Sequence, residues 1–568
     1  MSGTAAFRAT DLAVVIPTRQ RWEMLGRCLD ALATQSQTGF EIIVVADGRD
    51  QFPDLGDHAD AVTLLDQDHA GPGVARNLGI AHSRRPLILL MGDDMMAAPG
   101  LVAAHLQVHN RRPEPTDAVL GLVRWHPDSA QGPIQPWLEW SGTQFDLAGL
   151  REGEEAGWAR FYSSNASFKR PLFEQVGGFD PDFAFLYEDT ELGWRLDQAG
   201  MRLWFDPGAL TLHDHRYDWP GLRRRFETAA RAERRMVAKH AWFEPWFRAK
   251  AIEALTTKPP SAAWVALADR LPDTPLRQKA RDEANRWYHR QLAPFFLNAW
   301  AADQDVEELA AYLGDEFDLD RLRRHTHVIE DELAAAPDEA TFYRTSQAYL
   351  YDLTAFAAWE TKIPYRTDVA RYSPPGSRLL DYGCGIGTDG LRLGELGYRV
   401  DFADFDNPST RYLRWRLARR HIDARVYDID TEDIDTEDID PGYHLAYAFD
   451  VIEHVDDPFA FLGRLEAAAD LVAVNFLEPD PHDTHLHHHL PLTELMDHAE
   501  AAGLLRYRLY HQRSHLVIYR SPRSATPSGS GRPGWSRLGS GARRRLGPVL
   551  SGPQWWKAPG APGGKAWN

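Results

Sequence analysis

Two pairs of adjacent carboxylates are the residues in this sequence best suited to do chemistry. The first pair, Asp93 and Asp94, follows the apolar run of "ILLMGDDMM" (88–96), which indicates a short buried strand. Adjacent carboxylates repel each other unless a positive group lies beside them. A divalent metal that holds a polyphosphate would supply that charge. A turn before a helix starting near Pro99 is the simpler alternative, and these residues alone do not decide between the two.

The second pair, Glu188 and Asp189, lies in "FLYEDTELGWRL". A carboxylate beside another has a raised pKa, which suits a base that takes a proton from a hydroxyl. The same residues could simply start a helix. Beyond them, His213 ends the apolar stretch "ALTLHDH". A lone histidine is usually structural, but His213, or His215 as its rival, could bind a metal.

A glycine-rich turn forms the third chemical group. The stretch "LLDYGCGIG" (379–387) predicts a strand that ends in Asp381 and runs into glycines at alternate positions, which are Gly383, Gly385 and Gly387. Such a turn is weak evidence for any particular nucleotide. Further strand ends follow it, carrying Asp404 in "VDFADFD", Asp428 in "VYDID" and the stretch "DVIEHVDDP". With these strand ends, the prediction of a cofactor site is more specific than the glycine turn alone would allow.

The elements that must position the first two groups alternate along residues 1–235. Strands are expected at 12–18, 41–48, 62–66 and "PLILLMGDD", with helices over 20–34 and 73–83 between them. This alternation predicts a parallel α/β sheet with crossovers. Ligands of such sheets bind at the carboxyl ends of the strands. Asp47 and the Asp93–Asp94 pair both fall there.

The rest of the chain divides into three regions. Residues 236–340 are charged and alanine-rich, which predicts a helical connector. Residues 341–520 return to the α/β pattern, interrupted by the acidic repeat "TEDIDTEDID" (431–440), which predicts a solvated loop. The tail, 521–568, is rich in Gly, Pro and Ser and is expected to be disordered. Its arginines and tryptophans could touch an anionic membrane, although a tail without a role is the simpler interpretation.

Composition sets the broad class. A chain of 568 residues is too long for one core and predicts roughly three to four units of domain size. The net charge of −19 argues against a nucleic-acid partner. Two distant cysteines fit a reducing cytoplasm. No signal peptide is expected, and no apolar run approaches the ~20 residues that span a bilayer. The protein is therefore expected in the cytoplasm, with any membrane contact peripheral.

Five motifs in order resemble the inverting glycosyltransferases of family 2, which have the GT-A fold. They are "VVIPTRQR", "VVADGRD", "GPGVARNLGI", "LLMGDDM" and "GGFDPDFAFLYEDTELGWRL", and the resemblance covers residues 11 to about 215. It implies a nucleotide-sugar donor and a divalent metal, Mg²⁺ or Mn²⁺, held by Asp94 and His213. It places Asp93 on sugar, ribose or metal. The first aspartate of the family's signature is replaced here by Gly92, which puts the ribose and first metal contacts in doubt.

The same resemblance assigns the remaining residues of the first region. It implies nucleotide contact for Pro17, recognition of the base by Asp47, and a position near the diphosphate for Arg76. It implies that Asp189 is the catalytic base, with Glu188 supporting it. Family members often have two acids at the base-reading position, but Ala46 replaces the first of them here.

Residues from about 375 to 520 resemble class I S-adenosylmethionine-dependent methyltransferases, in the branch that includes ubiquinone-type O-methyltransferases. The resemblance places Asp381 near the amino-acid end of the cofactor, Asp404 on both ribose hydroxyls and Asp428 near the adenine. The three glycines would let the backbone approach the cofactor. An NAD-binding domain is the rival for the glycine turn, but it does not account for "DVIEHV".

Histidines supply the candidates on the acceptor side of this second region. His454 could take a hydroxyl proton, or Glu453 and His454 could hold a metal. Equally, this stretch could only shape the pocket and start a helix. The histidine-rich stretch "HDTHLHHHLP" matches no standard zinc spacing, and substrate contact is expected from one of His485, His487 or His488.

Taken together, the sequence predicts a bifunctional α/β enzyme. Its first domain would transfer a sugar with inversion, and its last would methylate an oxygen, on the hypothesis that both act on one glycan. Glycan, lipid-linked and natural-product acceptors all remain open. In the alternative, the protein is a methyltransferase only and its N-terminal domain is a scaffold that binds glycan or nucleotide. A degenerate C-terminal domain that only regulates is a further rival, against which the intact cofactor motifs count.

Overall fold

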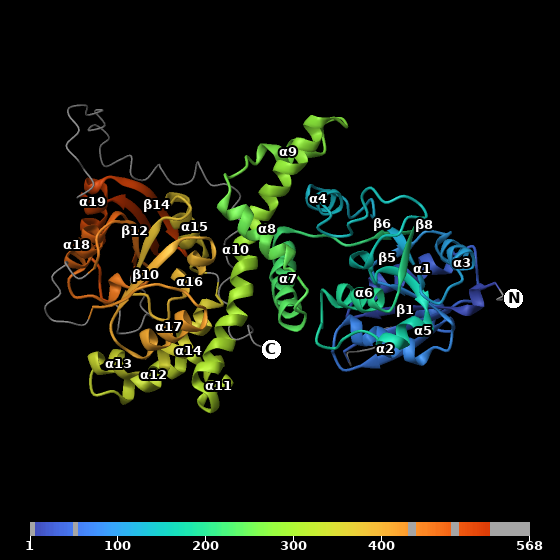
Figure 1. The fold of residues 1–568 in the computed structure, drawn as a ribbon, viewed down its shortest axis with the longest axis horizontal. Coiled ribbons are helices and arrows are strands. Elements are labelled where there is room, and N and C mark those ends of the chain that lie inside the picture. The colour runs from blue at the N-terminus through green and yellow to red at the C-terminus, as the bar shows by residue number, and fades with distance from the viewer. Residues whose placement is uncertain (1–5, 49–54, 360, 430–438, 479–487, 523–568) are drawn as a thin grey trace. The chain divides into compact units, whose positions relative to one another are not determined.

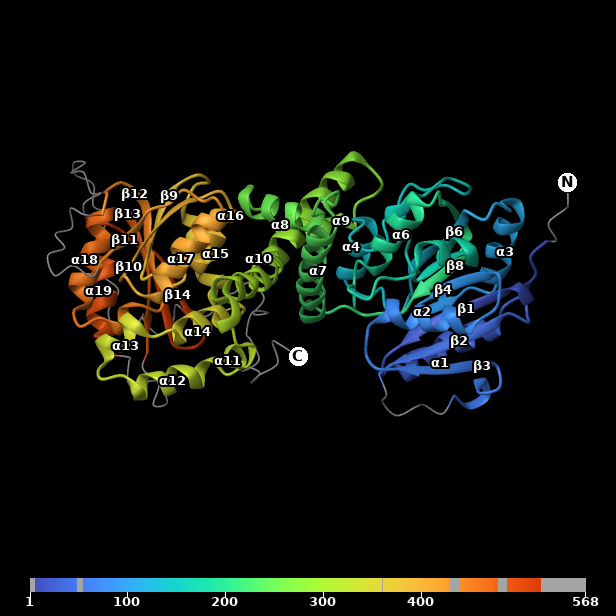
Figure 2. The same ribbon diagram turned by 60° about the horizontal axis from the view of Figure 1, so that its bottom comes forward.

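The computed structural model divides the chain into two compact units, each containing one β-sheet (Figures 1 and 2). The N-terminal unit comprises residues 1–247 and 259–291, and the C-terminal unit comprises 248–258 and 292–568. The residues that the structure describes are 6–48, 55–359, 361–429, 439–478 and 488–522. Nearly all of the tail and most of the acidic repeat therefore lie outside the described residues, and the predictions made for them stay predictions.

The sheet of the N-terminal unit has eight strands in the order β3-β2-β1-β4-β7-β6-β8-β5. The strands are β1 (Leu12–Thr18), β2 (Glu41–Asp47), β3 (Val62–Gln67), β4 (Leu87–Met91), β5 (Met95–Ala97), β6 (Asp117–Trp125), β7 (Asn165–Lys169) and β8 (Arg202–His213). The four strands from β3 to β4 are parallel, as predicted. The other half is mixed, because β7 runs antiparallel to β4 and β6, and β5 runs antiparallel to β8. The prediction of a parallel sheet is right for the first half only, since apolar periodicity does not encode strand direction.

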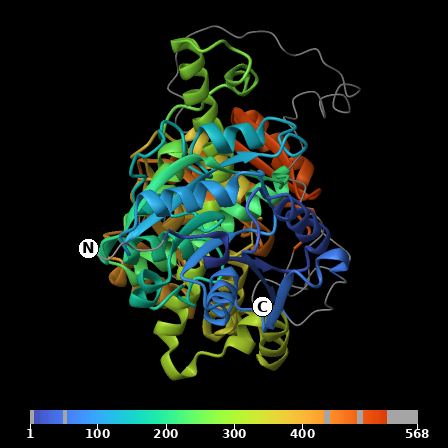
Figure 3. The same cartoon turned by 90° about the vertical axis from the view of Figure 1, so that its right-hand side faces the viewer.

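The N-terminal unit, which faces the viewer in Figure 3, also contains helices. They are α1 (Trp22–Ala33), α2 (Pro72–His82), α3 (Leu101–Arg111), α4 (Ile134–Trp140), α5 (Arg170–Val176), α6 (Glu188–Gln198), α7 (Trp219–Lys239) and α9 (Ala263–Ala268). Every residue of β4 is buried, which explains its wholly apolar sequence. A Cβ at Gly79 of α2 would lie 2.6 Å from Val15 Cγ1, so glycine there lets α2 pack directly on β1.

The sheet of the C-terminal unit has seven strands in the order β11-β10-β9-β12-β13-β15-β14. The strands are β9 (Arg378–Tyr382), β10 (Arg399–Asp404), β11 (Val426–Asp428), β12 (Tyr443–Ala448), β13 (Ala469–Leu477), β14 (Leu504–Tyr510) and β15 (Ser514–Arg520). The order reverses between β9 and β12, which is where ligands bind in open α/β sheets. Strand β15 lies between β13 and β14 and runs antiparallel to both. This edge differs from that of the all-parallel dinucleotide-binding sheet considered as the rival.

Residues 236–340 consist mainly of helices, and the domain boundaries predicted on either side of them stay predictions. The helices of this region other than α7 and α9, and those around the second sheet, are α8 (Trp246–Thr256), α10 (Pro275–Leu313), α11 (Leu319–Arg323), α12 (His325–Ala335), α13 (Glu339–Thr345), α14 (Ala348–Ala357), α15 (Ile363–Tyr372), α16 (Thr388–Glu395), α17 (Pro408–Arg419), α18 (Pro458–Ala468) and α19 (Leu492–Ala502). Helix α10 contributes its residues up to 291 to one unit and the remainder to the other. No helix among the described residues is long and apolar enough to cross a bilayer.

Candidate active sites

The paired aspartates lie in the turn that joins β4 to β5. The backbone N–H of Met95 donates to Gly92 O at 3.3 Å and closes this turn. Asp93 is fully buried and Asp94 is 9% exposed. Helix α3 begins later, at Leu101, without a side-chain cap. The simpler alternative considered for these acids is therefore half right, because they form a turn but cap no helix.

A positive group does lie beside the two carboxylates, and it is Arg21. Its Nε donates to Asp93 Oδ2 at 3.2 Å and its Nη1 donates to Asp94 Oδ2 at 2.8 Å. Thr18 Oγ1 donates to Asp93 Oδ2 at 2.7 Å. Burial and the charge of Asp94 raise the pKa of Asp93 to about 6, and Arg21 opposes that rise. No role was predicted for Arg21, since its partners lie 72 and 73 residues further along the chain.

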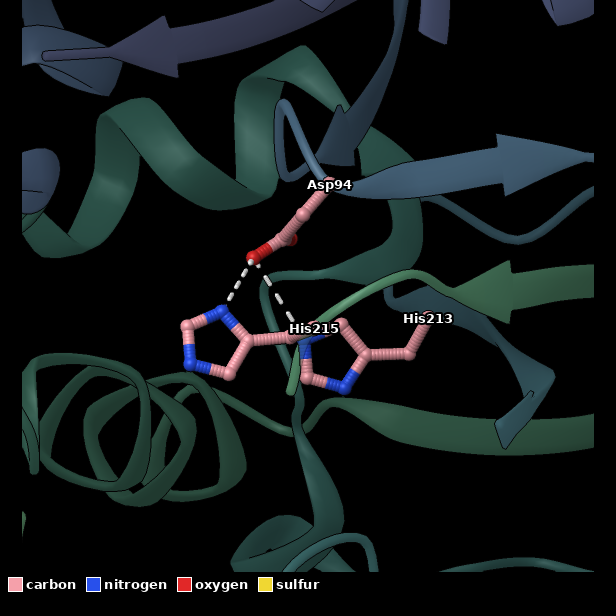
Figure 4. A group of neighbouring side chains, drawn as sticks. All are labelled: Asp94, His213 and His215. Atoms are coloured by element: carbon pink, nitrogen blue, oxygen red, sulfur yellow. Dashed lines mark ion pairs between the residues drawn. The ribbon is translucent and has the colours of Figure 1, made fainter. Parts of the chain in front are cut away.

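Two histidines converge on Asp94 from the end of β8, as Figure 4 shows. His213 Nε2 lies 3.4 Å and His215 Nδ1 lies 3.8 Å from Asp94 Oδ2. The three ligand atoms all lie within 4.8 Å of one another. Burial lowers the pKa of His215 to about 4, against the attraction of Asp94, so this ring is neutral and keeps a lone pair for a metal. One carboxylate and two imidazoles form a donor set that suits a divalent ion such as Mn²⁺.

The structure thus brings the predicted ligands Asp94 and His213 together, and it adds the rival His215 instead of excluding it. The N–H of Asp214 donates to Asp94 O at 2.8 Å, which ties the end of β8 to the aspartate turn. The ring of Trp125 packs against His213 with centroids 4.6 Å apart. These contacts fix the histidine ring beside the carboxylate. We refer to Asp94, His213 and His215 as the metal group.

The second carboxylate pair lies at the start of α6, after an unusual stretch of backbone. Leu186 and Tyr187 have φ values of 63° and 67°, in the left-handed region that non-glycine residues rarely adopt. Such conformations cost on the order of 1–3 kcal/mol each and persist where the surroundings enforce them. The Tyr187 hydroxyl donates to buried Glu233 Oε1 at 2.9 Å, which helps to hold this stretch. The backbone that leads into the Glu188–Asp189 pair is therefore held by its surroundings in a conformation that it would not adopt alone.

Arg76 lies beside this pair. Its Nη1 is 3.5 Å from Glu188 Oε1, and both side chains are buried. Burial and the neighbouring Asp189 raise the pKa of Glu188 to about 7, with Arg76 opposing the rise. Burial also raises the pKa of Asp189, against the attraction of Arg76 and the N–H groups of Ser163 and Thr190. A carboxyl with a pKa near neutrality is suited to accept a proton at physiological pH.

Asp47 and Pro17 lie at the ends of neighbouring parallel strands, where they were expected. Both oxygens of Asp47 are already used to hold one loop: they accept from the N–H groups of Ala70 at 2.8 Å and Gly71 at 3.0 Å, from Gln67 Nε2 and from His69 Nδ1. Burial alone would raise the pKa of Asp47, but these hydrogen bonds lower it. Asp47 therefore has a structural role that its motif did not indicate, and recognition of a base by Asp47 stays a prediction.

An expected result follows from the position of Arg21. Replacing Arg21 by glutamine leaves two adjacent carboxylates without their neutralising charge, so the metal-free protein should unfold at a temperature lower by about 4 °C. Mn²⁺ should raise the melting temperature of this variant more than that of the wild type, because the ion replaces the lost charge. Calorimetry with and without Mn²⁺ checks this. Equal Mn²⁺ shifts in both proteins would contradict it.

In the C-terminal unit, the glycine turn follows β9. Gly383, Gly385 and Gly387 have φ values of 73°, 51° and 73°. A Cβ at Gly387 would lie 2.3 Å from Leu413 Cδ1, and one at Gly383 would lie 2.6 Å from Val451 Cγ2. These glycines are therefore required by the backbone conformation and by packing, in addition to any approach of a cofactor.

The three predicted cofactor acids lie on the strands at the switch point of this sheet. Asp404 Oδ2 accepts from Gly385 N at 2.7 Å, and burial raises the pKa of Asp404 to about 6 against that hydrogen bond. Asp428 lies opposite Asp404 in the β10–β11 register. Asp381 is buried and accepts from Gly390 N at 3.0 Å. Burial and the charge of Asp389 raise the pKa of Asp381 to about 8.

The acceptor-side candidates lie beyond β12. The Tyr343 hydroxyl lies 3.3 Å from His454 Nδ1, a contact from α13 that no motif indicated. Within the described part of the chain, no third Asp, Glu, Cys or His completes a metal group with Glu453 and His454. The N–H of His488 donates to Glu453 O at 2.7 Å. His485 and His487 lie outside the described residues.

Comparison with known families matches both units. Residues 13–177 match the family model described as "Glycosyl transferase family 2", and residues 380–470 match the model described as "Methyltransferase domain". The chain thus carries a family 2 glycosyltransferase domain followed by a methyltransferase domain, and the predicted fusion is confirmed.

Among curated relatives, validoxylamine A glucosyltransferase of Streptomyces hygroscopicus subsp. jinggangensis is 30% identical, over 34% of this chain and 52% of the relative. Pre-mycofactocin glycosyltransferase of Mycobacterium tuberculosis is also 30% identical, over 37% of this chain and 44% of the relative. The chain spans about half the length of these relatives. A mannosyltransferase from Pyrobaculum calidifontis, solved with GDP-Man and Mn²⁺, aligns at 18% identity with a TM-score of 0.30, over 61% of this chain and 85% of that chain.

Proposed function

We propose that this chain is a bifunctional transferase. Its N-terminal unit transfers a sugar from a nucleotide-sugar donor with inversion and with a divalent metal. Its C-terminal unit methylates an oxygen with S-adenosylmethionine, on the same glycan. The acceptor is a glycan, a lipid-linked sugar or a natural product. The observation that carries this proposal is the metal group after β4 and β8, together with Arg76, which pairs with Glu188 and is within electrostatic range of both Asp189 and Asp93.

The glycosyl transfer assigned to the first unit uses its two acidic sites differently. A divalent ion held by Asp94, His213 and His215 would neutralise charge on the donor diphosphate. Asp189 takes the proton from the acceptor hydroxyl as that oxygen attacks the anomeric carbon. Attack from the face opposite the diphosphate inverts the configuration. Burial keeps the pKa of Asp189 above its usual range, and Arg76 lies against the supporting Glu188.

The methyl transfer assigned to the second unit relies on alignment of the two substrates. S-adenosylmethionine, when bound, supplies an electrophilic methyl group. Asp404, held by the N–H of Gly385, would accept hydrogen bonds from the ribose hydroxyls. Asp381 would bind the ammonium of the cofactor's amino-acid end. His454, beside Tyr343, would receive the acceptor proton, and positioning accounts for most of the rate gain.

A thermal-shift panel on the full chain tests both halves. UDP-, GDP- and dTDP-sugars are added with Mn²⁺, and S-adenosylmethionine is added in parallel. Ligands that bind the folded state raise the melting temperature by mass action. We expect a shift from one nucleotide class and from S-adenosylmethionine. If only S-adenosylmethionine shifts the protein, the N-terminal unit is a scaffold and the protein is a methyltransferase only.

Use of one glycan by both units is tested separately. The full chain is given the glycosylated product of its own first reaction together with labelled S-adenosylmethionine. Label should enter the glycan. Methylation of an unrelated small molecule, with none of the glycosylated product, would contradict the shared substrate.

The cofactor site makes its own prediction. Asp404→Asn should weaken S-adenosylmethionine binding at least tenfold, because it replaces a charged acceptor of hydrogen bonds by a neutral amide. Isothermal titration calorimetry measures the loss. Asp406→Asn is the matched control, since Asp406 is exposed and, within the described ranges, forms its ion pairs with the surface residues Arg411 and Arg414. Similar affinities in the two variants would contradict a ribose contact for Asp404.

A further inference from the structure

A basic helix follows the metal group and lies outside both the glycosyltransferase family model and the motifs that resemble that family. Helix α7 starts at Trp219, four residues after His215, whereas the family model ends at residue 177. Asp218 caps the helix by accepting the N–H of Gly221 at 2.7 Å. This cap fixes the start of α7 to the chain that leaves the metal group, so side chains of its first turns lie near that group.

Arg225 lies two turns into α7, and the side chain of Tyr217 lies between Arg225 and His215 of the metal group. Its Nη1 donates to the Tyr217 hydroxyl at 3.4 Å, and its guanidinium carbon lies 5.8 Å from the Tyr217 ring centroid. The ring of Tyr217 lies 4.4 Å, centroid to centroid, from the ring of His215. Arg225 itself is half-buried.

The charge of Arg225 is not neutralised by a neighbouring acid. Within the described residues, no carboxylate oxygen lies within 4.0 Å of its guanidinium. By contrast, Arg21 pairs with Asp94 at 2.8 Å, Arg76 lies 3.5 Å from Glu188, and Arg223 on the same helix donates to Glu227 at 2.8 Å. A long hydrogen bond to a phenol satisfies only one of the five N–H donors of an arginine.

The charge of Arg225 also acts on groups in both halves of the site. Burial lowers the pKa of His215, and the charge of Arg225 adds to that lowering. Burial raises the pKa of Glu188, and Arg225 opposes that rise. Arg225 therefore acts on the metal group and on the carboxylate pair, which lie on either side of the reacting sugar in the proposed transfer.

The geometry points to Arg225 as a binding residue for the donor's diphosphate, both before and during its departure. This inference rests on the proposed glycosyl transfer. In that step the bond from the anomeric carbon to the diphosphate oxygen breaks, and its electron pair stays on that oxygen. The new bond forms to the acceptor oxygen, whose proton goes to Asp189. The nucleoside diphosphate leaves with one more negative charge, and a planar guanidinium with free N–H donors is suited to receive it.

The test uses calorimetric binding to the full chain with Mn²⁺. UDP, GDP and dTDP are titrated first, and then the monophosphate of whichever nucleotide binds. Arg225→Ala should weaken the diphosphate at least tenfold and the monophosphate less than threefold, because the monophosphate lacks the second phosphoryl group that Arg225 contacts. Arg225→Lys should fall between the two. Arg224→Ala is the matched control, since Arg224 is exposed at the neighbouring position of α7.

Three results would overturn the inference. Unchanged diphosphate affinity in Arg225→Ala would show that Arg225 does not contact the diphosphate. Equal losses for diphosphate and monophosphate in Arg225→Ala and Arg225→Lys, with an altered melting curve, would assign Arg225 to the fold of α7 instead. If the wild type binds none of the three diphosphates with Mn²⁺, the proposed glycosyl transfer is contradicted, and so is this inference, which depends on it. Wild-type binding that is unaffected in Arg225→Ala leaves the proposed transfer intact.

Discussion

Asp94→Asn should transfer sugar about 1,000-fold more slowly than the wild type, a loss of about 4 kcal/mol of transition-state stabilisation. Asp94 provides the oxygen on which His213 and His215 converge, at 3.4 and 3.8 Å. Asparagine keeps the shape of the side chain but removes the negative charge that a divalent ion requires. Product formation from the donor found in the thermal-shift panel measures the rate, and electron paramagnetic resonance of Mn²⁺ measures metal binding.

Two controls make this result specific. Asp66→Asn changes an exposed aspartate on β3 in the same sheet and should leave transfer unchanged. Methyl transfer by Asp94→Asn should also be unchanged, since the cofactor residues belong to the other unit. Retention of both Mn²⁺ binding and sugar transfer in Asp94→Asn would show that the metal group does not hold the ion.

The second large effect is expected at the carboxylate pair. Asp189→Asn should slow transfer by about 10²–10⁴-fold, the usual contribution of a general base, while donor binding persists. Glu188→Gln should cost much less, because Glu188 acts through its neighbour. Single-turnover rates and donor affinities separate the two contributions. The larger loss in Glu188→Gln would reverse the two roles.

The pH profile distinguishes these roles further. Below about pH 7 the pair retains a proton, because burial and mutual repulsion raise the pKa of Glu188 to about 7. The proton lost near pH 7 is that of Glu188, and the new charge strengthens Asp189 as a base, so the wild-type rate should rise with pH through about 7. Glutamine cannot acquire that charge. The rise near pH 7 should therefore be absent in Glu188→Gln, and a rise that persists there would contradict coupling between the two carboxyls.

Local patterns in the sequence were enough to predict much of this fold. The apolar run 12–18 is β1 in full, and the stretch ending in the aspartate pair contains β4 with its five buried residues. The pair could be placed at the carboxyl end of a strand because period and burial are local properties. The same reasoning placed the glycine turn directly after β9.

What could not be predicted involves residues distant in sequence. Arg21 reaches its acidic partners across more than 70 residues, so no spacing rule joins them. Strand β7 runs antiparallel to β4, and its direction depends on which strand pairs with the free backbone groups of β4. Apolar alternation in the sequence is the same for either direction. Asp47 is a different case, because its motif predicted recognition of a base and gave no sign that Asp47 holds a loop. Its four hydrogen bonds in the structure reveal that second role.

Helix α10 belongs to both units, and this affects how the protein can be divided into fragments. The first half of that helix supplies Tyr288, which stacks on Trp137 of the N-terminal unit at 4.2 Å, and the second half supplies Glu308, which accepts from buried Arg416 of α17 at 2.8 Å. Neither unit is one uninterrupted stretch of chain, since residues 248–258 are grouped with the second unit before the chain returns to the first. A fragment cut at residue 235 would lose the cover of Trp137, and one starting at 341 would strip the partners of Arg416. No single cut in the chain therefore yields both units whole.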